Sequence, residues 1–140
     1  MEQWLSYAIM AMLMGGVAMV FAKMGMGSAN EHVALVIRTS VLLAMVVANA
    51  WYAGALRGVA TVDNRTMLWL VLAGLCTAVY WILYFKAIKT ANISVVATID
   101  RAGIVVTVLL SYFILKEPLT PRLLLGMGTI LAGTLILIWK

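Results

Sequence analysis

Three ionisable side chains of this 140-residue chain lie well inside apolar segments. Asp100 and Arg101 are neighbours in the stretch 92–115, and Arg38 lies in the stretch 31–51. A charge near the centre of a bilayer costs roughly 2.5–3.5 kcal/mol on insertion scales, so such residues are rare and usually functional. We therefore take these charges as the first candidates for a functional site.

The remaining composition is typical of an integral membrane protein. Hydrophobic residues make up 65% of the chain and charged residues 11%, whereas a soluble domain has roughly a quarter of its residues charged. No water-soluble fold of this length could bury so much apolar surface. The net charge of +5 does not indicate a nucleic-acid partner, because the basic residues separate apolar segments and are explained as interface anchors.

The apolar segments predict the fold class. A spanning helix needs roughly 20 mostly apolar residues, because lipid offers backbone groups no other partner. We predict an all-α integral membrane domain, 1–140, with five spanning helices at about 4–22, 31–51, 66–85, 92–115 and 121–139.

Polar residues at the predicted span ends support these boundaries. Ser28 and Glu31 have the spacing of a capping box before the second span. Asp63 or Asn64 can cap the third span. Thr120 followed by proline is typical of a helix start.

The depths of the buried charges can be compared from connectivity. We call the membrane face where the chain begins face A and the opposite face B; the second and fourth spans both start at face B. Arg38 is about seven residues into its span, and Asp100 and Arg101 are about eight and nine into theirs. At 1.5 Å rise per residue all three lie roughly 10–13 Å below face B. Arg38 and Asp100 are thus at matching depth and could pair.

This depth leads to two interpretations. Lys86 ends the predicted third span at face B, and its side chain could reach the same level. If Arg38 neutralises Asp100, Arg101 and Lys86 remain, and a cavity holding them would attract an anionic or zwitterionic ligand. The other interpretation is a packing pair of Arg38 and Asp100, with Arg101 extended toward the interface.

Aromatic residues follow a helical spacing on the third span. Tyr80 and Tyr84 are i,i+4 neighbours, as are Trp81 and Phe85. Such a stripe lines a pocket for organic molecules or packs against other helices. Gly103, just past the charged pair, could permit a bend in the fourth span.

Small residues gather on one face of the last span. Gly126 and Gly133 are seven apart, with Thr129 between them. Small faces let membrane helices approach closely. The face serves either as a homodimer contact or as packing within one bundle.

The positive charges do not favour either orientation in the membrane. Four fall at face A and four at face B: Arg57, Arg65, Lys116 and Arg122 against Lys23, Lys86, Lys89 and Lys140. This tie favours the hypothesis that copies insert in both directions and pair head-to-tail, although a topology fixed in another way would also give a tie.

Four segments resemble a known family. They are ALVIRT (34–39), YFKAIKTANISVVATIDRAG (84–103), LKEPLT (115–120) and GMGTILAG (126–133). In order and spacing the chain resembles a single-domain, five-helix, EamA-type member of the drug/metabolite transporter superfamily. Larger relatives hold two such units in inverted tandem, so the resemblance implies that a lone unit works as an antiparallel pair.

Residues 66–139 also resemble the last three helices of small multidrug resistance proteins. The spacing of Gly126 and Gly133 matches their dimerisation helix, and Gly103 falls at their helix bend. Those proteins carry a carboxylate in the first helix, and Gly15 stands about there in this chain. Cation/proton antiport through the first helix is therefore not supported, and Asp100 is the intramembrane acid available for proton coupling.

Two classes of function follow. The first is a non-enzymatic transporter of small organic metabolites, working by alternating access as a dimer in the lipid bilayer of a prokaryotic plasma membrane. Its cavity would hold the charges of Arg38, Asp100, Arg101 and Lys86, the walls Trp81, Tyr80 and Tyr84, and the hinge Gly103. The second is a non-transporting subunit that packs against a partner through the glycine face of the last span. No metal-ligand cluster, nucleophile set or phosphate loop occurs in the sequence, so we expect no cofactor and no metal.

Overall fold

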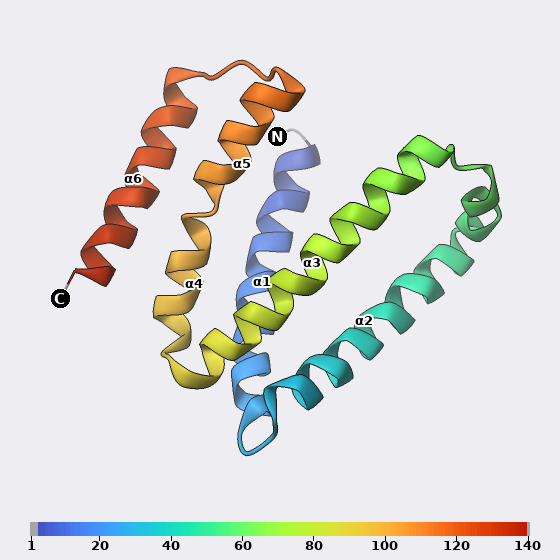
Figure 1. Ribbon diagram of the computed structural model, residues 1–140, viewed down its shortest axis with the longest axis horizontal. Helices are drawn as coiled ribbons and strands as arrows, with labels where there is room; N and C mark the ends of the chain where they lie inside the picture. Colours follow the sequence, from blue (N-terminus) through green and yellow to red (C-terminus); the bar gives the residue numbers. More distant parts are fainter. Residues whose placement is uncertain (1–2, 140) are drawn as a thin grey trace. The chain divides into compact units, whose positions relative to one another are not determined.

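The fold is entirely helical over the residues that the structure describes. The computed structural model describes residues 3–139. Five of its helical segments are long and apolar enough to cross a membrane: α1 (Gln3–Met26), α2 (Glu31–Tyr52), α3 (Asn64–Thr90), the segment Ile93–Leu115 and α6 (Pro121–Ile138) (Figure 1). The predicted all-α membrane fold with five spans is confirmed.

The chain forms two compact units, Met1–Thr90 and Ala91–Lys140. In the first unit α1, α2 and α3 contact one another, and the 3₁₀ turn η1 (Ala55–Thr61) links α2 to α3. Its buried side chains gather where the α1–α2 loop meets the end of α3: Met26, Tyr84, Phe85 and Ile88. Most other apolar side chains point outward, as expected where lipid replaces water as the solvent.

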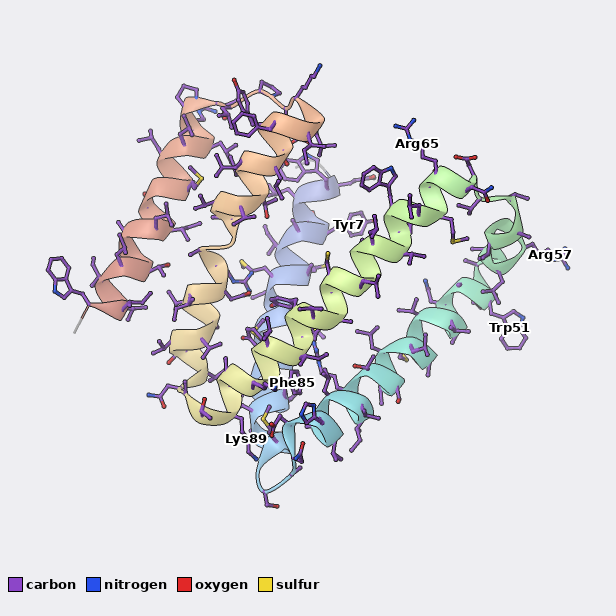
Figure 2. All side chains as sticks on the ribbon, viewed as in Figure 1. Tyr7, Trp51, Arg57, Arg65, Phe85 and Lys89 are labelled. Carbon is purple, nitrogen blue, oxygen red and sulfur yellow. The ribbon has the colours of Figure 1, made fainter. Side chains whose placement is uncertain are left out.

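Two lysines connect α1 and α3 at this end of the first unit. The ammonium group of Lys23, in the last turn of α1, donates to the carbonyl of Ile88 near the end of α3. In return, Lys89 donates to the carbonyls of Gly27 and Ala29, 3.3 and 2.6 Å away. Each lysine thus satisfies carbonyl groups left unpaired at or beyond the end of the other helix. Figure 2 shows Lys89 here, and Arg57 and Arg65 at the opposite end of α2 and α3.

Two helix ends lie about one turn beyond the predicted ones, and one cap differs. α1 and α3 continue about one turn further than predicted, to Met26 and Thr90, because basic residues in a last turn favour the helix rather than end it. Asn30, not Ser28, caps α2: its side chain accepts the His32 N–H at 2.8 Å. The capping-box interpretation is therefore wrong.

Two other predicted caps are present. The Asp63 carboxylate accepts the Arg65 N–H at the start of α3. The Thr120 hydroxyl accepts the Leu123 N–H at the start of α6, which has Pro121 in its first turn.

The fourth span in the second unit is not one regular helix. It consists of α4 (Ile93–Arg101), α5 (Ile104–Leu110) and a π-helical turn, η2 (Ser111–Leu115). Between α4 and α5 the N–H groups of Ala102 and Gly103 bond to carbonyls three residues back, each at 3.0 Å, instead of four. The helix therefore tightens into a 3₁₀ turn directly after the charged pair.

This tightened turn takes the usual partner away from the Thr98 carbonyl. In a regular helix the Thr98 carbonyl would accept the N–H of Ala102, which here bonds to Ile99. The hydroxyl of Thr134 on α6 donates to that Thr98 carbonyl at 3.3 Å and to its own Ile130 carbonyl at 2.9 Å. Thr134 is buried, so α6 supplies the hydrogen bond that lipid cannot.

Candidate functional site

Arg38 on α2 stacks its guanidinium against the indole of Trp81 on α3. Its Cζ lies 3.6 Å from the Trp81 ring centroid and 5.7 Å from that of Phe85, and the side chain is half-buried. A cation over an aromatic face gains about 0.5–1 kcal/mol when exposed and about 2 kcal/mol when desolvated. Because insertion of the charge costs roughly 2.5–3.5 kcal/mol, the aromatic contact offsets only part of that cost.

Within the unit Met1–Thr90, none of the described carboxylates forms an ion pair with Arg38. Glu31 begins α2 and lies 4.0 Å from His32, and Asp63 precedes α3. Stacking uses the face of the guanidinium, whereas its N–H donors point outward in its plane. Arg38 can therefore donate a forked pair of hydrogen bonds to an oxyanion while Trp81 supports it.

The aromatic stripe of α3 forms one continuous cluster. The ring of Trp81 lies 5.1 Å from Tyr80, 5.7 Å from Tyr84 and 6.1 Å from Phe85, each in an edge-to-face arrangement. The Tyr84 hydroxyl donates to the sulfur of Met19 on α1, and Tyr84 and Phe85 are buried. Figure 2 shows Phe85 on the stretch of α3 that approaches α1. The buried rings hold Trp81 in place beneath Arg38.

Arg38 borders two grooves of the first unit. The groove between α2 and α3 has a volume of about 400 Å³. Besides Arg38 and Trp81, its lining includes Leu35, Thr39, Leu42, Gly74, Thr77 and Ala78. A second groove of about 370 Å³ lies along α1 and α2 and is bordered by Phe85. The cation thus lines both grooves.

Asp100 and Arg101 border an open groove of the second unit. They occupy the last turn of α4, and the groove, about 1010 Å³ in volume, runs along α4, α5 and α6. Gly103, Thr129 and Gly133 also line it. A positive side chain in the last turn of a helix is favoured by the helix dipole, which partly explains Arg101.

Four threonines add oxygen atoms to this groove: Thr98, Thr107, Thr129 and Thr134. Each hydroxyl donates its proton to a carbonyl four residues earlier in its own helical segment. Their oxygen lone pairs are left to accept hydrogen bonds. The groove therefore carries one acid, one base and several acceptors, which suits a ligand with both donor and acceptor groups.

The structure divides the predicted site residues between the two units. It brings Arg38, Trp81, Tyr80 and Tyr84 together in the first, and Asp100, Arg101, Gly103, Thr129 and Gly133 together in the second. The pairing of Arg38 with Asp100 joins different units and stays a prediction. So do the hinge role of Gly103 and the dimer role of the glycine face.

Lys86, Gly126 and Lys140 lie apart from these groups. Lys86 was predicted to end the third span, but it lies exposed within α3, which runs to Thr90. Lys89 is the lysine in the last turn. Gly126 is not among the residues that line the α4–α6 groove. Lys140 lies outside the described residues.

Sequence reasoning did not identify Thr98, Thr134 or the lysines that connect α1 and α3 as structurally important. A threonine in a spanning helix gives no distinct signal, because its hydroxyl can always bond to its own helix. Among the described residues, no group of three or more His, Cys, Asp or Glu side chains is arranged to hold a metal ion.

Five spanning segments and two polar sites within them define an integral, multi-pass membrane protein. The EamA-like transporter family model matches residues 2–139, and the chain belongs to this family. The chain is 32% identical over 136 residues to "Uncharacterized transporter in cobO 3'region" from Sinorhizobium sp, covering 97% of this chain and 96% of that protein. No solved structure matches the chain significantly. The protein is accordingly a membrane transporter by family.

Proposed function

We propose that the protein carries small organic metabolites, anionic or zwitterionic, across a prokaryotic plasma membrane by alternating access. The observation that carries this proposal is the placement of Asp100 and Arg101 beside a groove within a spanning segment, at the point where the helix tightens. In transporters, interrupted helices often form the binding site near the middle of the membrane. Intramembrane charges that cost this much to insert are usually retained for function.

The two polar sites have complementary chemistry. Arg38, held on Trp81, offers donors to an oxyanion. The groove beside Asp100 offers a carboxylate and threonine oxygens to a donor group such as an ammonium. The groove beside Asp100 is also lined by Arg101, so it offers partners to both charged ends of a zwitterion within one unit.

The working form in this proposal is a homodimer of oppositely oriented copies. The four-to-four distribution of positive residues between the two faces supports it, because neither orientation is favoured during insertion. Two inverted copies would supply the symmetry that larger transporters carry within one chain. The face containing Gly126, Thr129 and Gly133 is our candidate for the contact between copies.

Transport by reconstituted protein tests the proposal. A thermal-shift screen of metabolites on purified protein would select substrates, because a bound ligand raises apparent stability. Counterflow of a selected metabolite would then be measured in vesicles. Arg38→Ala and Asp100→Asn should abolish counterflow. The matched controls Arg65→Ala and Asp63→Asn, at a helix start outside the grooves, should retain it. Wild-type rates in both site variants would refute the site.

Dual insertion has its own test. Cys76 is the single cysteine of the chain, so Cys76→Ala gives a background for one new cysteine. In right-side-out vesicles, Arg57→Cys in this background should react partly with an impermeant thiol reagent, with the rest reacting only after permeabilisation. Complete labelling from one side would refute the antiparallel dimer.

A further inference from the structure

The α2–α3 groove is lined by the cation Arg38, by apolar side chains and by two threonines, Thr39 and Thr77. Gly74, Thr77 and Ala78 follow one another on α3 at helical spacing and border the groove opposite residues of α2. A Cβ atom added at Gly74 would meet no atom within 4 Å, so there is open space beside this residue. Trp81, seven residues after Gly74, also lines the groove and supports Arg38.

The charge of this groove is not balanced within its own unit. The Thr77 hydroxyl already donates to the Ala73 carbonyl, at 2.8 Å. None of the described carboxylates of the unit pairs with Arg38, and the Trp81 stack offsets only part of the cost of the charge. A group that approaches Arg38 from the groove is therefore stabilised if it is an oxyanion and destabilised if it is a cation.

We propose that the α2–α3 groove binds a small organic carboxylate. Arg38 holds the two carboxylate oxygens with its N–H donors beside Trp81, and the apolar body of the ligand extends from there along Ala78, Thr77 and Gly74. This inference rests on the proposed function, since it names the class of substrate that the Arg38 site of that transporter takes. The volume of about 400 Å³ is near the lower end for ligand pockets, which limits the body to about one ring and a short chain.

An organic carboxylate and a lipid with a phosphate headgroup both carry an oxyanion on an apolar body. A site for a free carboxylate and a site for a lipid headgroup differ in how the lipid composition affects binding of the carboxylate. A carboxylate site binds its ligand equally well with and without anionic lipid. A headgroup site would be occupied by anionic lipid and would lose the carboxylate in competition.

Binding to the full chain in nanodiscs of phosphatidylcholine tests the proposal by isothermal titration. Three probes share one apolar body: 4-phenylbutanoate, 4-phenylbutan-1-ol and 4-phenylbutylamine. The carboxylate should bind at least about tenfold more tightly than the alcohol and the amine, because a charge-assisted hydrogen bond is worth at least that factor. Equal binding of the three probes would overturn the proposal without any variant.

Variants locate the site. Arg38→Gln should reduce the preference for the carboxylate to less than about threefold, and Arg38→Lys should restore only part of it, because lysine lacks the planar fork. Gly74→Leu should fill the groove and weaken 4-phenylbutanoate by about tenfold or more. Arg65→Gln and Gly128→Leu are the matched controls and should change nothing, since neither residue borders the groove.

Three further results would overturn the carboxylate site. Loss of 4-phenylbutanoate binding when phosphatidylglycerol is added would assign Arg38 to a lipid headgroup. A change of oligomeric state in Gly74→Leu, with probe binding intact, would assign the groove to a helix contact. Unchanged preference in Arg38→Gln would place the anion elsewhere. Conversely, the expected binding with no counterflow of any carboxylate would overturn the proposed transport and leave this binding site standing.

Discussion

The contact between Arg38 and Trp81 gives the sharpest energetic prediction. Its geometry, 3.6 Å from Cζ to the ring centroid with a half-buried side chain, lies between the exposed and desolvated cases of a cation–π pair. We therefore expect a coupling free energy of about 1–2 kcal/mol, a factor of about 5–30 in the equilibrium constant for unfolding. Phe85 is 5.7 Å from the same Cζ and should couple by less than about 0.5 kcal/mol.

A double-mutant cycle measures this coupling. The cycle uses Arg38→Met, Trp81→Leu and the double variant, with Phe85→Leu in place of Trp81→Leu as the matched control cycle. Unfolding of the protein in mixed detergent micelles would be followed by far-ultraviolet circular dichroism, because Trp81→Leu alters tryptophan fluorescence. Each cycle removes the separate effects of the single changes, so the difference between the cycles reports the stack itself.

The refuting result is a coupling for Trp81 that is below about 0.3 kcal/mol, or no larger than the coupling for Phe85. Either value would mean that the indole does not support the guanidinium. The preorganised donor on which the carboxylate site depends would then be absent, whatever the charge preference of the groove.

Two further changes test the second unit. A side chain on Gly103 would place its Cβ 3.0 Å from a backbone carbonyl, so Gly103→Ala should lower the free energy of unfolding by about 1 kcal/mol. Gly128→Ala, in open space, should cause no such loss, and equal stability of the two variants in detergent unfolding would contradict the prediction. Thr134→Val keeps the shape but removes a hydrogen bond between helices, and should cost about 0.6–1.7 kcal/mol in the same assay. Thr129→Val removes a bond within its own helix and should cost less; the reverse order would count against the role of Thr134.

The number of spans and their order could be predicted from the sequence. Lipid requires each spanning segment to satisfy its own backbone, so a run of about 20 apolar residues has little choice but to form a helix. The Thr120 cap before α6 could also be predicted, because a cap depends only on residues that are close in the sequence. Predictions failed where a local signal competed with another, as with Ser28 and Asn30 before α2.

The site could be predicted only in part. The rise of 1.5 Å per residue gives the depth of Arg38 from the sequence, but not the direction in which it points around the helix axis. Which face of α2 meets α3, and hence that Arg38 lies over Trp81 rather than reaching toward the interface, depends on how the two helices pack. The stripe of aromatic residues could be predicted from the sequence, whereas its role as a support for Arg38 could not.

The sequence by itself determined the membrane class, the five spans, the family and the residues that carry charge into the apolar layer, because each depends on composition, length or local pattern. The tertiary structure decided that the span after α3 tightens at Gly103 and that Thr134 pairs with the carbonyl released there. It also decided that Arg38 borders a groove between α2 and α3. These features depend on contacts between residues far apart in the chain, and lipid, unlike water, leaves the unsatisfied groups no partner except another helix.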